Sequence, residues 1–91
     1  MYESSYSEEF VKEILKLKKR DKKAFSRVMK KIDEILKTPN PDSYKNLKNE
    51  LKSFKRVHIG HFVLIFKVNK KKRIIYFEDY KHHDKIYKTK K

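Results

Sequence analysis

The chain has 91 residues, which predicts a single domain, residues 1–91, with a thin hydrophobic core. Lys and Arg number 26 against 12 Asp and Glu, and the formal net charge of +14 at pH 7 favours nucleic acid or an acidic protein as a partner. No apolar run approaches the roughly 20 residues that span a bilayer. Residues 1–10 lack the pattern of a signal peptide, and the absence of Cys excludes disulfides and thiolate metal sites. We therefore expect a cytoplasmic protein that does not act at a membrane.

The N-terminal segment predicts a short strand followed by a helix. Tyr2 and Tyr6 alternate with polar residues, which is typical of a strand. Ser7 is a suitable N-cap because its hydroxyl can accept a hydrogen bond from a free N–H group of the first helical turn. The acidic and apolar residues that follow predict a helix from about Glu8 to Lys19.

A second helix is predicted between Asp21, its candidate N-cap, and Lys37. Apolar residues recur there at helical spacing: Phe25, Val28, Met29, Ile32, Ile35 and Leu36. Pro39 and Pro41 cannot continue the helix. The two helices should form a hairpin with one apolar face, which needs a second layer to cover it.

The second half of the chain predicts that layer. Short apolar runs rich in β-branched and aromatic residues are separated by polar turns: Phe54 to Ile59, His61 to Val68, and Arg73 to Glu78. Such runs are typical of an antiparallel meander. The predicted fold is therefore α+β, with the helical hairpin packed on a four-stranded antiparallel sheet.

The acidic residues and histidines do not predict a metal site. Glu78 and Asp79 are adjacent at the end of the last predicted strand, where neighbouring side chains point to opposite faces. His82 and His83 are also adjacent, a spacing that disfavours joint ligation of one ion. We therefore expect neither a metal nor another cofactor.

The sheet half carries a set of cations with aromatic residues among them. Such a set can neutralise phosphates and stack on unpaired bases. Its members include Lys45, Lys48, Lys52, Lys55, Arg56, His58, Tyr80, Lys81, His82, His83, Lys85 and Tyr87. RNA cleavage without a metal needs a base for the 2′-OH, cations at the phosphate and an acid for the leaving oxygen. His58 and His83 are the imidazoles of the set and so its candidates for proton transfer, but the same surface is equally compatible with simple RNA binding.

Three motifs in this order resemble the RelE/ParE superfamily of toxins. Residues 44–49 resemble a Leu-Lys-Gly segment, with Asn49 in place of the glycine. Residues 56–66 resemble an Arg-x-Arg-x-Gly-Asp-Tyr-Arg motif followed by apolar residues, and residues 82–87 resemble a closing His-Arg-x-x-Val-Tyr motif. The resemblance covers almost the whole chain and implies a strand, two helices and a three-stranded meander.

The RelE branch implies an endoribonuclease that cleaves mRNA in the ribosomal A site by 2′-OH attack, without a metal. The catalytic residues would be Lys48, Arg56, His58, His83 and Tyr87, and the phosphate-binding residues Lys45, Lys52, Lys55, Lys81 and Lys85. His58 and His83 stand where the family has arginines. Val63 stands in place of a central phosphate-binding arginine, while His61 and Phe62 replace the Asp and Tyr of the same motif.

The resemblance leaves a second function open, because ParE-type toxins with the same fold poison DNA gyrase through protein contacts. A non-enzymatic RNA-binding module is a third possibility. For both the RelE-type and the ParE-type toxin, the resemblance implies an antitoxin of the RelB type. The net charge of +14 favours an acidic, partly disordered partner that folds on the toxin. We expect it to cover the basic face or displace residues 83–87, giving a heterodimer or heterotetramer.

Overall fold

The computed structural model describes residues 1–47 and 53–88, with side chains as far as Lys85. The elements follow the predicted order, with their bounds within a few residues of those expected. They are β1 (Glu3–Tyr6), α1 (Glu8–Arg20), α2 (Lys22–Lys37), the 3₁₀ turn η1 (Pro41–Ser43), β2 (Lys55–Ile59), β3 (Phe62–Asn69), β4 (Ile74–His82) and α3 (His83–Lys88). The short helix α3 was not predicted, because the sequence 83–88 has no apolar repeat long enough to reveal it.

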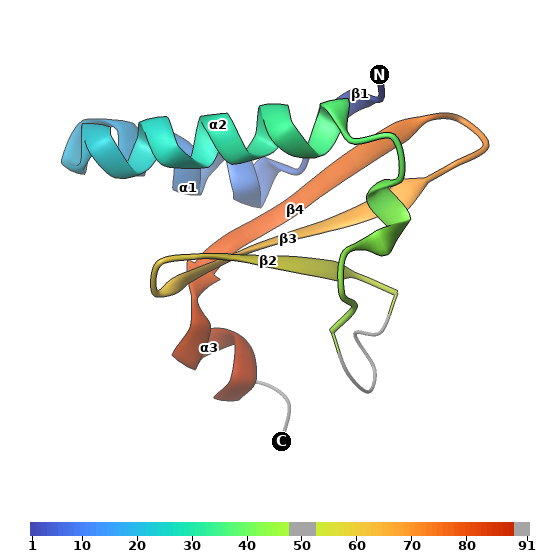
Figure 1. Cartoon of the computed structure of the whole chain (residues 1–91). Coiled ribbons are helices and arrows are strands. Elements are labelled where there is room, and N and C mark those ends of the chain that lie inside the picture. The colour runs from blue at the N-terminus through green and yellow to red at the C-terminus, as the bar shows by residue number, and fades with distance from the viewer. Residues whose placement is uncertain (48–52, 89–91) are drawn as a thin grey trace.

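The sheet is mixed, which corrects the prediction of an antiparallel sheet. The strand order is β1-β4-β3-β2, with β2, β3 and β4 antiparallel to one another. β1 instead lies parallel to β4, with Glu3 opposite Ile74 and Tyr6 opposite Phe77. A parallel pair needs a long crossover connection, and here the helical hairpin is part of it (Figure 1). The alternating pattern of β1 identifies a strand but does not give its direction.

The predicted caps begin both long helices. The Ser7 hydroxyl accepts a hydrogen bond from the Phe10 N–H (3.0 Å), and the Asp21 carboxylate accepts one from the Ala24 N–H (3.1 Å). The hairpin of α1 and α2 covers one face of the sheet (Figure 1). Between these layers lies the main core, which includes fully buried Val28, Ile35, Leu64, Phe66, Ile75 and Phe77.

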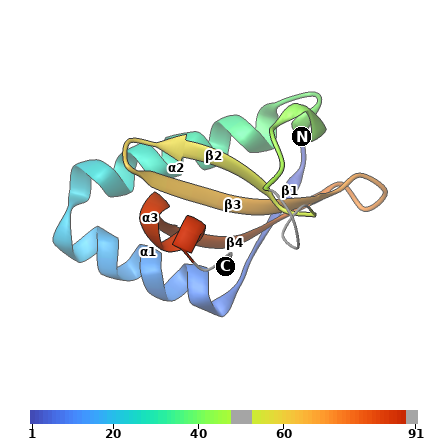
Figure 2. The ribbon, with the colours of Figure 1, turned by 90° about the horizontal axis from the view of Figure 1, so that it is seen from below.

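The opposite face of the sheet, which we call the outer face, has a second and smaller core. Val63 and Ile65 of β3 pack there with Leu47, and Phe54 lies against them. Side chains alternate along a strand, so Arg56 and His58 of β2 share this face, whereas Val57 and Ile59 pack against the main core. Figures 1 and 2 place α3 on the outer-face side of the sheet, away from α2.

Candidate nucleic-acid interface

An irregularity in β4 determines which of its side chains reach the outer face. Phe77 pairs with Phe66 and Asp79 pairs with Ile65, so Glu78 is an extra residue that shifts the register. After this bulge, Asp79 and Lys81 lie on the outer face and Tyr80 packs into the main core. Without this extra residue, strict alternation would have placed Tyr80 on the outer face and Asp79 and Lys81 on the face of the main core.

The outer face brings together three of the predicted site residues. His58 of β2 lies opposite Val63 of β3, which in turn lies opposite Lys81 of β4. On the next row, Arg56 lies opposite Ile65, and Ile65 opposite Asp79. The ammonium group of Lys81 lies 3.3 Å from the Asp79 carboxylate, and both side chains are partly exposed. A guanidinium, an imidazole and an ammonium group therefore surround an apolar centre.

Val63 is that apolar centre, and its side chain is completely buried. It packs against Leu47 and Ile65 rather than facing solvent. The position where related motifs carry a phosphate-binding arginine thus belongs to the small core of this chain. Among the described residues, the cations nearest to Val63 across the strands are His58, Arg56 and Lys81 rather than a side chain at position 63 itself.

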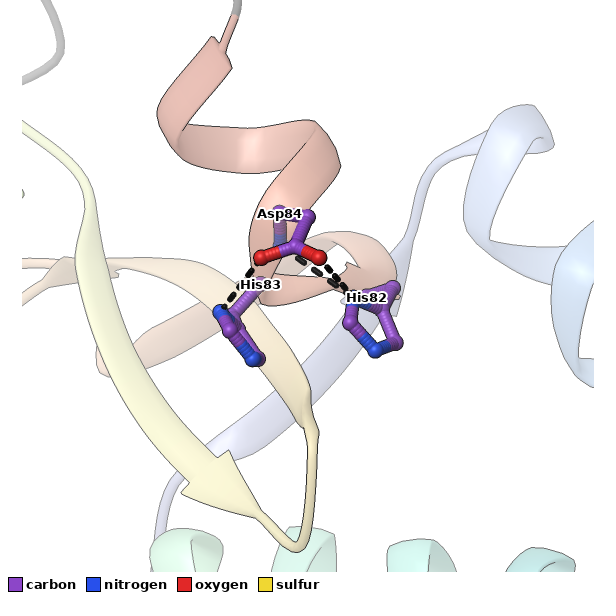
Figure 3. Close-up of side chains that lie close together, drawn as sticks. All are labelled: His82, His83 and Asp84. Atoms are coloured by element: carbon purple, nitrogen blue, oxygen red, sulfur yellow. Dashed lines mark hydrogen bonds and ion pairs between the residues drawn. The ribbon is translucent and has the colours of Figure 1, made fainter.

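His83 begins α3, two residues after Lys81, and lies in a group of aromatic and acidic side chains (Figure 3). Its Nδ1 atom is 3.2 Å from Oδ1 of Asp84, and its ring stacks on that of His82 with centroids 4.6 Å apart. His61, in the β2–β3 turn, lies beside both rings at 6.2 Å between centroids. The sequence prediction did not include His61 or Asp84, although His61 directly follows the turn glycine Gly60.

The other predicted residues are more dispersed. Lys45 is exposed beside β2, where its carbonyl oxygen accepts a hydrogen bond from the Arg56 N–H at 2.9 Å. Lys85 is exposed on α3, and Tyr87 falls in the last turn of that helix. Lys48 and Lys52 lie outside the described residues.

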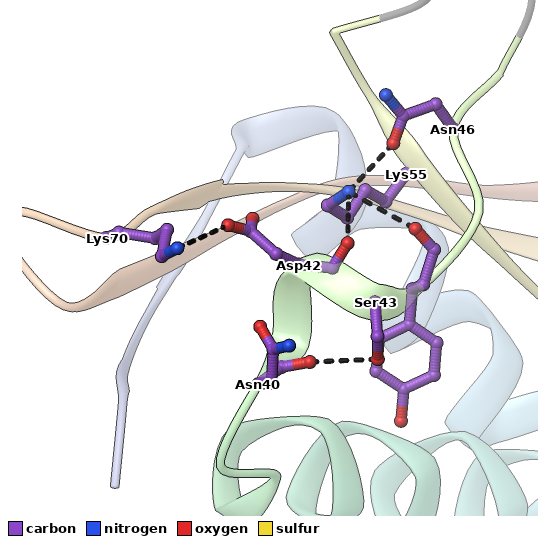
Figure 4. Close-up of polar contacts among 7 residues, drawn as sticks. Asn40, Asp42, Ser43, Asn46, Lys55 and Lys70 are labelled. Atoms are coloured by element: carbon purple, nitrogen blue, oxygen red, sulfur yellow. Dashed lines mark hydrogen bonds and ion pairs between the residues drawn. The ribbon is translucent and has the colours of Figure 1, made fainter.

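Lys55 is used differently from the prediction that it binds phosphate. Its ammonium group donates to the carbonyl oxygens of Asp42 (2.9 Å) and Tyr44 (3.2 Å) and to the side-chain oxygen of Asn46 (2.8 Å) (Figure 4). These contacts engage all three donors that an ammonium group has. Lys55 therefore ties Asp42, Tyr44 and Asn46 to the start of β2.

Tyr80 is a core residue, although it lies between two outer-face residues in sequence. Its side chain is 4% exposed and its ring stacks on Phe62 at 4.9 Å. Burial is the main cause that raises the pKa of its phenol. The positive charges of Arg27 and Arg20 oppose this rise, and the negative charge of Asp21 adds to it. The phenol is thus neutral at physiological pH and is no candidate for a catalytic base.

Among the surface depressions of the described residues, two that lie away from this cluster bear on function. One, beside the β3–β4 turn, is lined by Lys67, Lys70 and Tyr76 together with the acidic residues Asp42 and Glu78, which disfavour phosphate there. The other is an apolar groove of about 240 Å³ on the helical hairpin. We call it the hairpin groove, and its lining includes Tyr6, Val11, Leu15, Lys18, Phe25 and Met29.

Within the described part of the chain, no helix is long and apolar enough to cross a membrane.

Solved toxin structures share this fold. The isolated Escherichia coli RelE toxin superposes with a TM-score of 0.73 at 16% identity, covering 98% of this chain and 98% of that one. The RelE–RelB complex from the archaeon Pyrococcus horikoshii gives 0.67 at 21% identity, covering 89% of this chain and 93% of that chain. The YoeB–YefM complex from Staphylococcus aureus gives 0.74 at 16% identity, covering 91% of this chain and 98% of that chain.

Sequence comparison identifies the family. Residues 5–87 match the family described as the ParE toxin of the type II toxin–antitoxin system parDE. A protein of Methanocaldococcus jannaschii described as putative toxin RelE4 is 48% identical over 92 aligned positions, which cover 100% of this chain and 96% of that protein. An uncharacterised protein of Methanosarcina mazei is 51% identical over 73 positions, covering 79% of this chain and 83% of that protein. The chain therefore belongs to the RelE/ParE family of toxins of type II toxin–antitoxin systems.

Proposed function

We propose that this toxin is a ribosome-dependent endoribonuclease that cleaves mRNA in the ribosomal A site. The observation that carries the proposal is that Arg56, His58 and Lys81 lie on neighbouring rows of the outer face. His83 follows two residues after Lys81. A surface with these groups provides phosphate binding and proton transfer side by side. The net charge of +14 also favours association with ribosomal RNA.

Each residue of this set has a proposed role. Arg56 binds the scissile phosphate, because a guanidinium group can donate two parallel hydrogen bonds to phosphate oxygens. The two imidazoles of His58 and His83 supply the base that removes the 2′-OH proton and the acid that protonates the 5′-oxygen. Tyr87 contacts the substrate nucleotide. Lys48, which matches a catalytic lysine position of the family, belongs with the catalytic residues. Lys81, Lys85 and Lys45, with Lys52 from the sequence, bind flanking phosphates.

In this mechanism the attacking 2′-oxygen and the leaving 5′-oxygen exchange protons only with side chains. The chain needs no metal for either step, because general acid–base catalysis and cationic stabilisation provide both. The burial of Val63 leaves the transition-state charge to Arg56 and the lysines beside it. Loss of a single donor of this kind costs about 10²–10³-fold in rate.

Primer extension on a defined mRNA in a reconstituted translation system tests the proposal. The wild-type chain should generate new 5′ ends inside A-site codons only when ribosomes are present. Arg56→Ala and His83→Ala should each reduce cleavage by about 10²-fold or more. Lys23→Ala removes a charge from an exposed position on α2 and should cleave like the wild type. The absence of ribosome-dependent ends from the wild type, or equal losses in all three variants, would contradict the proposal.

Inhibition of DNA gyrase is the second candidate function. Two observations favour it: the matching family is the ParE toxin, and Val63 replaces an arginine that an RNase would use. A supercoiling assay with purified gyrase distinguishes the two functions. Gyrase inhibition that persists in Arg56→Ala, together with no mRNA cleavage, would replace the endoribonuclease proposal.

We further propose that an acidic RelB-type antitoxin neutralises the toxin as a heterodimer or heterotetramer. The hairpin groove offers an apolar surface, in which Val11 and Leu15 are 43% and 56% exposed and Met29 is 39% exposed. Lys18 lies at this groove, and the chain is strongly cationic, so an acidic amphipathic helix complements it in both shape and charge. The same partner reaches the basic outer face with a separate segment.

Affinity measurements with the antitoxin encoded next to the toxin test this interface. Leu15→Glu should weaken binding by tenfold or more, because a carboxylate on the groove repels an acidic helix and reduces apolar burial. Ser26→Glu introduces the same charge at an exposed position of α2 that does not line the groove, and should bind normally. Equal affinities for the two variants would exclude the hairpin groove as the docking site.

A further inference from the structure

We propose that His82, His83 and Asp84, joined by His61, bind one divalent ion of the zinc class. Ligand atoms of His82, His83 and Asp84 all lie within 4.8 Å of one another. The Asp84 carboxylate lies between the two imidazoles, with Oδ1 at 3.2 Å from Nδ1 of His83 and Oδ2 at 3.7 Å from Nδ1 of His82 (Figure 3). Small side-chain rotations would allow an ion to lie about 2.0–2.2 Å from each ligand atom, which is the bond length that zinc requires.

The secondary structure explains why two adjacent histidines converge. Along a continuous strand, neighbouring side chains point to opposite faces, and the adjacent spacing of His82 and His83 was predicted to disfavour joint ligation of one ion. β4 ends at His82, however, and α3 begins at His83. The alternation therefore stops between the two residues, and their rings stack with planes 26° apart. The Asp84 N–H also donates to Nδ1 of His82 at 3.2 Å, a hydrogen bond that an ion bound at this nitrogen would replace.

His61 provides a fourth donor from a different part of the chain. Its ring centroid lies 6.2 Å from the rings of both His82 and His83. The His83 N–H donates to the carbonyl oxygen of His61 at 3.0 Å, which holds the β2–β3 turn against the start of α3. A modest rotation of His61 thus completes a set of three imidazoles and one carboxylate, which suits the four-coordinate preference of zinc.

The donor set also defines the class of ion. Imidazole nitrogen suits Zn²⁺, Ni²⁺, Co²⁺ and Cu²⁺, whereas Mg²⁺ and Ca²⁺ prefer carboxylates, carbonyls and water. Asp84 is the single acidic member of the cluster, and Lys81 and Lys85 lie close to it in sequence. Binding therefore depends on coordination by imidazole rather than on a negative field. Mg²⁺ should consequently not bind at this site.

Occupancy would have two consequences. An ion bound by residues of the β2–β3 turn, β4 and α3 would tie these elements together and stabilise the folded chain. It would also engage His83, so it should inhibit RNA cleavage. This second consequence rests on the proposed function, whereas the binding itself does not.

Isothermal titration calorimetry of the untagged chain with Zn²⁺ provides the main test, and Co²⁺ absorption reports the coordination geometry. We expect one ion per chain, a tetrahedral Co²⁺ spectrum, a higher Tm with Zn²⁺ and no response to Mg²⁺. His82→Ala and Asp84→Asn should each weaken Zn²⁺ binding by at least tenfold. His58→Ala is the matched control, because His58 is an exposed imidazole on β2 outside the cluster, and should bind like the wild type. Asp84→Asn preserves the side-chain shape at an exposed position, and far-UV circular dichroism checks that the variants fold.

The proposal is overturned if millimolar Zn²⁺ does not bind, or if His58→Ala loses as much affinity as the cluster variants. Binding that all the variants retain would equally overturn it, since the ion would then lie elsewhere. In the cleavage assay, Zn²⁺ should inhibit the wild type reversibly on addition of a chelator and should inhibit Asp84→Asn less. Zinc binding without any cleavage activity would leave the site established and would refute the endoribonuclease proposal alone.

Discussion

The hydroxyl group of Ser7 donates a hydrogen bond to the main-chain carbonyl oxygen of Glu78 at a distance of 2.7 Å. The same hydroxyl oxygen accepts the Phe10 N–H and so caps α1. Glu78 is the extra residue that shifts the register of β4. One side chain thus joins the start of the first helix to the bulge that places Lys81 on the outer face.

Ser7→Ala removes both hydrogen bonds, and we expect it to lower the free energy of unfolding by about 1–2 kcal/mol. Urea denaturation followed by circular dichroism measures the change. Ser26→Ala is the control, because Ser26 is exposed within α2, where alanine is at least as favourable as serine. If Ser7→Ala proved as stable as Ser26→Ala, the hydroxyl would not secure the bulge.

Lys55→Met should lower the free energy of unfolding by about 1–3 kcal/mol, because two partly buried carbonyl oxygens and the exposed side-chain oxygen of Asn46 lose a charged donor. Lys70→Met is the matched control, since the exposed ion pair between Lys70 and Asp42 should contribute little (Figure 4). Chemical denaturation compares them. A Lys55→Met chain with normal stability and a severe loss of RNA cleavage would restore Lys55 to the phosphate-binding set.

Gly60→Ala should lower stability by about 1–2 kcal/mol, since a Cβ atom is unfavourable in the left-handed region. Gly60 has φ +65°, and an added Cβ would lie 3.0 Å from a guanidinium nitrogen of Arg27. Gly60→Asn should lower the Tm less than Gly60→Ala does, although its side chain is larger, because asparagine tolerates this conformation. Thermal unfolding of both variants tests this order. An unchanged Tm for Gly60→Ala would show that the turn adapts without strain.

Val63→Arg would install the arginine of related motifs, yet we expect it to destabilise the chain by several kcal/mol rather than to increase activity. The side chain at this position is completely buried among apolar residues, and a lone charge there is costly. His58→Arg places the same group on the exposed neighbouring strand and should fold normally. The expectation fails if Val63→Arg is as stable as His58→Arg in a denaturation assay.

The caps at Ser7 and Asp21 and the apolar spacing of α2 were predicted correctly, because capping and helical periodicity depend on residues close in sequence. The role of Lys55 was not predictable in the same way. Its three acceptors lie 9 to 13 residues away, in a segment whose path depends on where the sheet lies. The convergence of His82 and His83 was also missed, since it depends on a strand ending between them.

The sequence by itself determined the helices, the three strands of the meander, the basic character of the sheet half and the family resemblance, because each is expressed in local patterns of residues. Only the tertiary structure decided the direction of β1, the bulge at Glu78 and the burial of Val63. These features arise from pairing and packing between residues far apart in sequence, such as Ser7 with Glu78, and a local pattern does not encode such partners. Which cations share the outer face is therefore a property of the folded sheet.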